Sequence, residues 1–351
     1  MTRKKARQVI GRTALVLATT VLLVLLAVVG AVFVILRGPS RDAQELLTRS
    51  LKETSAIGFI PDLFLPKERV DEIVSYKAAE LAGASTDASL VTIAAKRGET
   101  QTGGSGAAVE TKPTEPGRQL EEGIWLEDIT GPNYRGVLMI VEDPGRIFVG
   151  TPAAFGNYGL TLEQMVVTYD AVAGINAGGF YDPGGNGNGG IPDGIVITNG
   201  KLVWGSPGDY SSVIGFDGDG VLHVGNMTAQ EALDKGVRWA CTFGPPLVVN
   251  GEPEHGAQIT ESSVNPRTAI GQRADGAVLL LVIDGRQISS IGCSFEELIR
   301  IFLEYGAVNA ANLDGGSSSK MIYDGQALNE NASVIGTRPL PTSFLVRRAG
   351  Q

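Results

Sequence analysis

The segment 309–321, NAANLDGGSSSKM, places a carboxylate, two glycines and three serines directly after a run of small residues. Asp314 could supply a carboxylate for catalysis. Gly315, Gly316 and Ser317 could supply backbone N–H and hydroxyl donors for an anion. Asp-Gly and Ser-rich segments also form ordinary polar turns between strands. The residue types therefore allow either an anion site beside a catalytic carboxylate or a simple turn.

Two common motifs are excluded for this segment. It lacks the Gly-x-Ser-x-Gly pattern of a nucleophile elbow, and His223 and His255 are the only histidines in the chain. The sequence therefore argues against a Ser-His-Asp triad built on Ser317. A nucleotide-binding P-loop is excluded as well, because Lys320 follows the serines and no Gly-Lys-Ser/Thr pattern is present.

Three further segments carry polar residues where predicted strands begin or end. INAGGFYDPGG contains Asn176 and Gly178, where a backbone could approach a ligand closely. NPRTAIG contains Arg267 and Thr268, and IDGR contains Asp284. Taken alone, each of these segments is more often a turn or a surface ion pair than a functional site.

The elements that must position these residues are predicted to be short strands with a few helices. The 47 glycines show no collagen period and are typical of many tight turns. A Ser or Thr followed three residues later by Glu or Gln marks the start of each of three helices, and the third is predicted to end at Gly306. The fold class is predicted as α+β or mixed α/β, with a β-rich single catalytic domain. The three capping boxes are Thr161/Gln164, Thr228/Glu231 and Ser294/Glu297.

The N-terminus is predicted to cross a membrane. Residues 1–12 form a tail with five basic residues and no acid, and residues 13–36 are uncharged. About 24 residues at 1.5 Å rise cover roughly 36 Å, which exceeds a hydrocarbon core of about 30 Å. The absence of an A-x-A cleavage site favours an uncleaved anchor over a signal peptide. The basic tail predicts a cytoplasmic N-terminus and an extracellular body.

Composition divides the rest of the chain into three parts. Residues 37–82 show helical spacing of apolar residues and are predicted to form a helical stalk. Residues 83–118 are small, polar and rich in Pro and Gly, which is typical of a flexible linker. Residues 119–348 are predicted to form the folded domain.

Charge and cysteine content limit the partners and the chemistry. The formal net charge is −9, and the +5 of residues 1–12 leaves −14 on the remainder. A body this acidic argues against nucleic acid as a partner. Cys241 and Cys293 are the only cysteines, and they could form a disulfide or remain free buried thiols.

Six segments in this order resemble the phosphodiester glycosidase family, which includes bacterial exopolysaccharide-associated proteins. They are NAGGFY, FGPPLVVNG, NPRTAIG, LLLVIDGR, NAANLDGGSSSKM and GTRPLPTSFLV. The resemblance covers about residues 119–348. It implies hydrolysis of a sugar-1-phosphodiester at the glycosidic side, which releases the sugar and leaves a phosphomonoester.

The resemblance also implies roles for particular residues. Phosphate is a good leaving group, so the site needs donors for phosphate oxygens and a carboxylate to guide water or stabilise the sugar cation. Asp314 and Asp284 are the expected catalytic carboxylates, with Asn176 orienting sugar or water and Arg267 clamping the phosphate. The expected substrate-binding residues are Thr268, Gly315, Gly316, Ser317, Arg338 and Gly178.

No cofactor is expected to be required. A Ca²⁺ or Mg²⁺ ion held by oxygen ligands around Asn176, Asp193 and Asp314 is an alternative that the sequence leaves open.

Two functions from different classes remain open at this stage. The first is an extracytoplasmic hydrolase that cleaves sugar-phosphate linkages in cell-wall or surface polysaccharide. The second is a non-catalytic polysaccharide-binding or exopolysaccharide assembly factor that uses the same residues. Asp314, Asp284 and Arg267 together favour the hydrolase, because a binding site alone rarely needs two carboxylates near an anion clamp.

Overall fold

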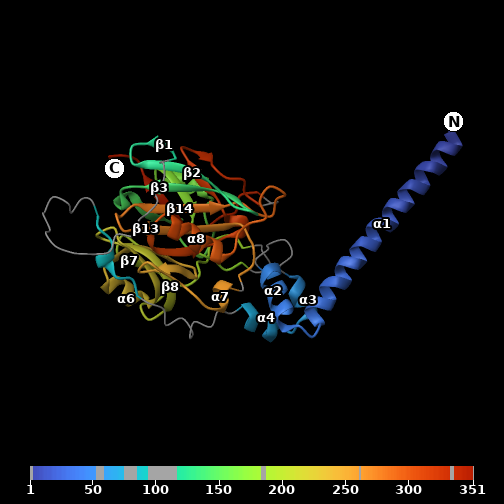
Figure 1. Cartoon of the computed structure of the whole chain (residues 1–351), viewed down its shortest axis with the longest axis horizontal. Helices are drawn as coiled ribbons and strands as arrows, with labels where there is room; N and C mark the ends of the chain where they lie inside the picture. The colour runs from blue at the N-terminus through green and yellow to red at the C-terminus, as the bar shows by residue number, and fades with distance from the viewer. Residues whose placement is uncertain are drawn as a thin grey trace. The chain divides into compact units, whose positions relative to one another are not determined.

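The structure is a computed structural model of the chain (Figure 1). It describes residues 3–52, 59–74, 85–93, 117–182, 187–260, 262–332 and 336–350. The chain divides into two compact units, Met1–Tyr76 and Lys77–Gln351. The parts of the predicted stalk and linker that fall at 53–58, 75–84 and 94–116 lie outside the described residues.

The first unit is helical. Helix α1 (Arg3–Arg37) contains the stretch Leu15–Arg37, the only helix of the described residues that is long and apolar enough to cross a membrane. Three short helices follow, α2 (Arg41–Lys52), α3 (Ile60–Phe64) and α4 (Lys67–Val74). They share a small core with the end of α1, made of Leu36, Leu65, Val70 and Ile73.

The second unit is built from three antiparallel sheets, the largest of which has eight strands. The strand order in this sheet is β1-β2-β3-β14-β13-β15-β11-β12. The bounds are β1 (Arg118–Glu121), β2 (Ile124–Thr130), β3 (Arg135–Val141), β11 (Pro246–Val249), β12 (Glu252–Pro253), β13 (Arg267–Arg273), β14 (Val278–Ile283) and β15 (Ala307–Leu313).

Two five-stranded sheets complete the domain, with orders β7-β6-β10-β8-β9 and β17-β16-β5-β18-β4. The first consists of β6 (Val196–Thr198), β7 (Lys201–Trp204), β8 (Tyr210–Asp217), β9 (Leu222–Thr228) and β10 (Val237–Thr242). The second consists of β4 (Ile147–Gly150), β5 (Ala171–Asn176), β16 (Met321–Tyr323), β17 (Gln326–Ala327) and β18 (Ser343–Arg347).

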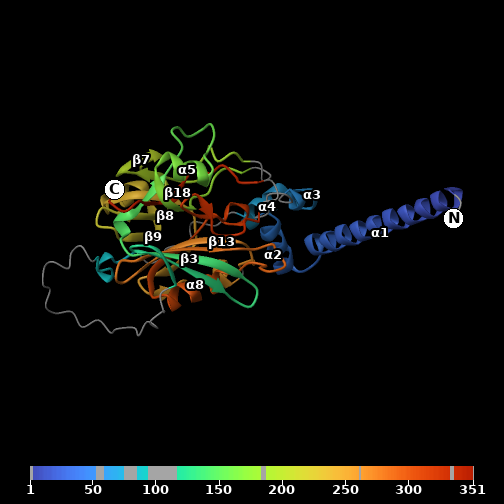
Figure 2. The same ribbon diagram turned by 90° about the horizontal axis from the view of Figure 1, so that it is seen from above.

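The three sheets enclose one central core, and each has a helix on its outer face. Central side chains such as Ile175, Ile214 and Leu280 come from all three sheets. Figure 2 shows β3 and β13 between α8 on one side and β8, β9 and β18 on the other. The outer helices are α5 (Leu162–Thr168), α6 (Ala229–Asp234), the four-residue α7 (Ala257–Thr260) and α8 (Phe295–Glu304).

The predicted β-rich mixed fold is confirmed, as are the three predicted helix starts. Each capping box is present with both of its reciprocal hydrogen bonds, at Thr161, Thr228 and Ser294. Gly306 adopts φ +74° directly after α8 and its C-cap Tyr305, which is the left-handed conformation that a helix-terminating glycine provides.

Part of the segment predicted as a linker lies against the domain. The Thr86 hydroxyl donates to the carbonyl of Val224 (3.2 Å) and accepts from its N–H (3.0 Å), so it pairs with strand β9. Val91 is buried, and the N–H of Thr92 donates to the carbonyl of Ala274 (2.8 Å). Residues 85–93 are therefore bound to the folded domain.

The two cysteines, both among the described residues, are buried free thiols. Cys241 belongs to the central core, and Cys293 belongs to the core between the large sheet and α8. Burial raises the pKa of the Cys241 thiol to about 12, so this thiol stays protonated at neutral pH.

Candidate active site

The ends of two sheets meet where the predicted site residues cluster. Strand β13 begins at Arg267, paired with Ile283 at the end of β14, and Thr268 pairs with Leu313 at the end of β15. Asp284 and Asp314 therefore leave the large sheet at the same edge. In the third sheet, β5 ends at Asn176, and its partner β18 begins there.

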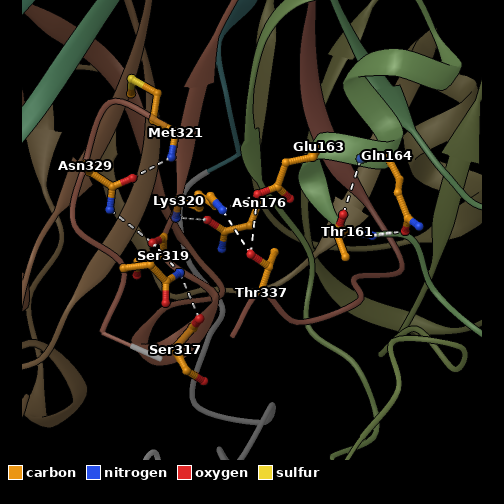
Figure 3. Close-up of polar contacts among 11 residues, drawn as sticks. Thr161, Glu163, Gln164, Asn176, Ser317, Ser319, Lys320, Met321, Asn329 and Thr337 are labelled. Atoms are coloured by element: carbon orange, nitrogen blue, oxygen red, sulfur yellow. Dashed lines mark hydrogen bonds and ion pairs between the residues drawn. The ribbon is translucent and has the colours of Figure 1, made fainter. Parts of the chain in front are cut away.

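Asn176 joins these ends through its side chain. Its Oδ1 accepts hydrogen bonds from the Thr268 hydroxyl (2.8 Å) and from the N–H of Lys320 (3.0 Å). Its Nδ2 donates to the carbonyl of Asp314, and the N–H of Asp314 donates to the carbonyl of Ala177 (2.9 Å). Figure 3 shows Asn176 beside Lys320, with the hydrogen bond between them drawn as a dashed line. Asn176 is fully buried, so its geometry indicates a role in holding the backbone of Asp314.

The Asp314 carboxyl is a candidate reactive group. It accepts a hydrogen bond from the Ser318 side chain, while its Oδ2 is buried and has no hydrogen-bond partner among the described residues. Burial raises the pKa of Asp314 to about 7, although the Ser318 hydrogen bond and the Arg338 charge lower it. The carboxyl can therefore gain or lose a proton near neutral pH, as an acid–base catalyst requires.

Arg338 carries the positive charge that lowers the pKa of the Asp314 carboxyl. It is buried, donates twice to the Asp182 carboxylate (2.7 Å each), and lies over the Phe180 ring at 4.9 Å. Asp193 adds a third carboxyl, whose pKa is raised by burial and by the nearby charge of Asp182. Asp182 and Asp193 also raise the pKa of Asp314. Three carboxyl groups thus influence one another around a single arginine.

Two glycines of this region are required by close packing. A Cβ at Gly178 would lie 2.8 Å from Thr342 Oγ1, which accepts the Gly178 N–H, and 3.0 Å from Cys241 Cβ. A Cβ at Gly179 would lie 2.7 Å from Asp193 Oδ2. The predicted ligand-binding residue Gly178 is therefore in contact with protein atoms on its Cβ side.

The structure places Arg267 on the other face of the large sheet. Adjacent residues of a strand point to opposite faces, and Thr268 points toward Asn176. The Arg267 guanidinium donates to the carbonyls of Ser263 (2.5 Å) and Cys293 (3.3 Å) and stacks over Phe295 at 4.2 Å. Arg267 thus lies on the α8 side, and the structure does not bring its guanidinium together with the Asp314 carboxyl.

Asp284 lies at the same sheet edge and is linked to the serine-rich loop. Its Oδ1 accepts from Asn329 Nδ2 (3.0 Å), and the same nitrogen donates to the carbonyl of Ser319 (3.2 Å). Burial raises the pKa of Asp284, partly offset by the hydrogen bond from Asn329. Asn329 therefore holds the second predicted carboxylate beside the loop that carries the first.

The serine-rich loop is a short 3₁₀ turn, Gly316–Ser318, in which Gly316 has φ +61°. The N–H of Gly316 donates to Pro266 (2.9 Å), and the N–H of Ser318 donates to Gly315 (3.1 Å). Ser317 is buried, and its carbonyl accepts from Asn331 (3.0 Å). Part of the predicted donor cradle is therefore engaged within the protein, and the loop serves chiefly to present Asp314 and Ser318.

Lys320 at the end of this loop forms an ion pair with Glu163, in which the lysine side chain is largely buried and the carboxylate is 40% exposed. Its Nζ donates to Glu163 Oε1 and to the Thr337 hydroxyl (3.0 Å), as Figure 3 shows. Burial raises the pKa of Glu163, but the hydrogen bonds that this carboxylate accepts and the charge of Lys320 together outweigh burial, so the pKa is lowered overall. The ion pair connects the loop to α5 and to the residue that precedes Arg338.

No metal centre is evident from side-chain geometry. Within the described ranges, no group of three or more His, Cys, Asp or Glu side chains could hold a metal ion. The expected alternative of a Ca²⁺ or Mg²⁺ ion near Asn176, Asp193 and Asp314 stays a prediction.

Sequence reasoning did not single out Asp182, Glu163 or Lys320 as parts of the site. Asp182 and Arg338 lie 156 positions apart in the chain, and Glu163 and Lys320 lie 157 apart. No local spacing reveals such pairs. The available signal was chemical, because an arginine or lysine in an apolar or Pro-rich segment requires a carboxylate partner if it is buried.

Residues 169–347 match the family model described as phosphodiester glycosidase, and this range is just over half of the chain. The chain belongs to the phosphodiester glycosidase family. The match contains Asn176, Asp182, Asp314 and Arg338, so the family region includes the residues that meet at the sheet edge.

Relatives from bacteria and animals agree with this family. An SPbeta prophage-derived uncharacterized protein, YomE of Bacillus subtilis (strain 168), is 34% identical over 175 residues, covering 48% of this chain and 27% of that protein. N-acetylglucosamine-1-phosphodiester alpha-N-acetylglucosaminidase of Mus musculus is 26% identical over 236 residues. This match covers 61% of this chain and 45% of the mouse protein. The matches thus span less than half the length of either curated relative.

A solved structure shares the fold. The catalytic domain of the zebrafish enzyme of the same name, described as auto-inhibited by its pro-peptide, superposes with a TM-score of 0.54 at 22% identity. The superposition covers 64% of this chain and 82% of that domain. The two domains therefore share their fold.

Proposed function

We propose that this chain is an extracytoplasmic hydrolase that cleaves the glycosidic bond of sugar-1-phosphodiesters in cell-wall or surface polysaccharide. The observation that carries the proposal is the Asp314 carboxyl, whose buried Oδ2 has no hydrogen-bond partner among the described residues and whose pKa is lowered by the charge of Arg338. Family membership supports the reaction class. The polymer is inferred from the predicted membrane attachment.

We assign different roles in the reaction to Asp314 and Arg338. Cleavage on the sugar side leaves a phosphomonoester, so negative charge grows on the phosphate as the bond breaks. The Arg338 guanidinium can stabilise this charge electrostatically while its two terminal nitrogens hold the Asp182 carboxylate. Ionised Asp314 can accept a proton from the attacking water or stabilise the positive sugar carbon.

Release of reducing sugar tests this proposal directly. Purified protein is incubated with a UDP-linked sugar or a sugar-1-phosphate aryl ester, beside an Asp314→Asn variant. Wild type should release sugar, and the variant should lose at least about 10²–10³ in rate, the usual loss when a preorganised electrostatic group is removed. Binding of substrate by wild type without hydrolysis would instead support a polysaccharide-binding or assembly factor.

We also propose that α1 is a membrane anchor with the N-terminus in the cytoplasm and the domain outside. The basic tail before the uncharged span supports this orientation. Protease added to intact cells should remove a C-terminal tag and spare an N-terminal one, while permeabilised cells should lose both. Protection of the C-terminal tag in intact cells would overturn the orientation.

A further inference from the structure

The short helix α3 and its N-cap residue Phe59 expose two large apolar side chains on one face. Phe59 and Leu63 are 50% and 67% exposed, and their spacing of four residues places them on the same side of a helix. The opposite side of α3 supplies the core of the unit, because Pro61 and Leu65 are buried. The exposed pair is therefore not needed to hold the first unit together.

The position of α3 along α1 is fixed by an aromatic contact. The ring of Phe64 packs edge-to-face on Phe33, with centroids 6.0 Å apart and an interplanar angle of 71°. Phe33 lies four residues before the end of the apolar stretch Leu15–Arg37, which is about 6 Å at 1.5 Å rise per residue. Figure 1 shows α3 beside this end of α1.

The end of α1 is part of the fold of this unit. Leu36 is fully buried, and its carbonyl accepts a hydrogen bond from Gln44 Nε2 (2.6 Å) of α2. Gln44 Oε1 in turn accepts from Arg69 of α4 (3.3 Å). Cleavage at the end of the span would remove Leu36 from this core, so the packing favours retention of α1.

We propose that α3 is an interfacial membrane segment, in which Phe59 and Leu63 insert into the lipid surface beside the span. The inference rests on the proposed anchoring of α1. Segments of this type bury an apolar face about 5–10 Å deep at the boundary between headgroups and acyl chains. Phe33, which contacts Phe64 of α3, lies about 6 Å from the end of the apolar stretch, within that range of depth. Large apolar side chains are also exposed on the last turns of the span, where Val34 is 66% exposed.

Tryptophan reporters in the full chain test the proposal. Leu63→Trp and, as a second reporter, Phe59→Trp are reconstituted in phosphatidylcholine/phosphatidylglycerol vesicles that contain brominated lipids. Glu68→Trp is the matched control, because Glu68 is exposed on the neighbouring helix α4. The wild-type signal of the three native tryptophans is subtracted.

The α3 reporters should show blue-shifted emission and at least about twofold stronger quenching than the control, because only lipid-inserted indole meets the bromine atoms. Equal quenching at Leu63, Phe59 and Glu68 in protein that floats with the vesicles would overturn the assignment of α3 alone. Failure of the wild-type chain to float would overturn the anchor, and the proposal with it. Neither outcome depends on hydrolase activity.

Discussion

The burial that gives the Asp314 carboxyl a pKa near neutral pH also lowers the stability of the folded protein when this carboxyl is ionised. Its folded-state pKa of about 7 lies above the ordinary value of 3.8, because burial disfavours the charged form. Its contribution to stability is therefore fully present below about pH 3.8. That contribution is lost progressively as pH rises through about 7, where the folded protein must carry a buried charge.

We therefore predict opposite effects of Asp314→Asn on stability and activity. The variant should melt at a higher temperature than wild type at pH 8, by a difference worth on the order of a few kcal/mol, and the gain should shrink toward pH 4. Hydrolysis by wild type should rise between about pH 6 and 8 as Asp314 ionises. Asp275→Asn, at an exposed ion pair, is the control. A pH-independent stability difference would contradict the raised pKa.

Substitution of the two buried arginines, Arg338 and Arg267, should have different effects on the kinetics. Arg338 acts on Asp314 and already binds a carboxylate with both fork nitrogens. Arg267 binds backbone carbonyls and the Phe295 ring. We predict that Arg338→Lys raises KM and lowers kcat, by roughly 10²–10³ in kcat/KM, whereas Arg267→Lys mainly lowers the melting temperature.

The measurement is a comparison of kcat, KM and thermal unfolding for both variants. A loss of kcat/KM in Arg267→Lys as large as that in Arg338→Lys, with normal stability, would return Arg267 to the role that the sequence predicts. The sequence predicts Arg267 as a phosphate clamp and the adjacent Thr268 as a substrate-binding residue, whereas neighbouring side chains along a strand point to opposite faces.

At the scale of elements, local patterns were predicted well and long-range pairings were not. Each capping box is a contact between residues three positions apart, so the spacing alone locates the starts of α5, α6 and α8. The contact between Asn176 and Thr268 spans 92 positions and depends on how two sheets meet. The residue types at the strand ends indicate the region of the candidate site. Which of these residues contact one another depends on the three-dimensional fold.

The ion pair between Lys320 and Glu163 is predicted to position Arg338 by holding Thr337. In Lys320→Met, Thr337 loses its hydrogen bond from Nζ, and Arg338 is held less firmly beside Asp314. Because the Arg338 charge lowers the Asp314 pKa, that pKa should rise. A rise of about one unit would reduce the rate about tenfold on the acid side of the profile, where rate follows the ionised fraction.

The pH–rate profile of Lys320→Met shows whether Lys320 positions Arg338 or only stabilises the folded protein. Arg300→Gln, which removes an exposed ion pair on α8, is the control and should leave the profile unchanged. A lower melting temperature with an unshifted profile would show that Lys320 serves only stability.

For the whole molecule, charge sets the conditions under which a polymer can reach the site. Residues 13–351 carry a formal net charge of −14, since the chain carries −9 and its first 12 residues +5. A phosphate-containing polymer, the proposed substrate, is itself negative, so this net charge would repel it at long range and its binding would depend on local groups such as Arg338. A small substrate with one phosphodiester experiences much less of this repulsion.

Ionic strength should therefore affect the two kinds of substrate differently. Between about 0.01 and 0.15 M salt the Debye length falls from about 30 to 8 Å, which screens repulsion between the domain and distant phosphates. We predict that KM for a poly(sugar phosphate) falls severalfold over this range, whereas KM for a UDP-linked sugar stays constant or rises, because salt also weakens its pairing with Arg338. Initial rates of reducing-sugar release at matched pH measure both. A KM for the polymer that rises with salt would mean that positive local groups, not the net charge, govern its approach, and would favour a basic binding surface beyond the site.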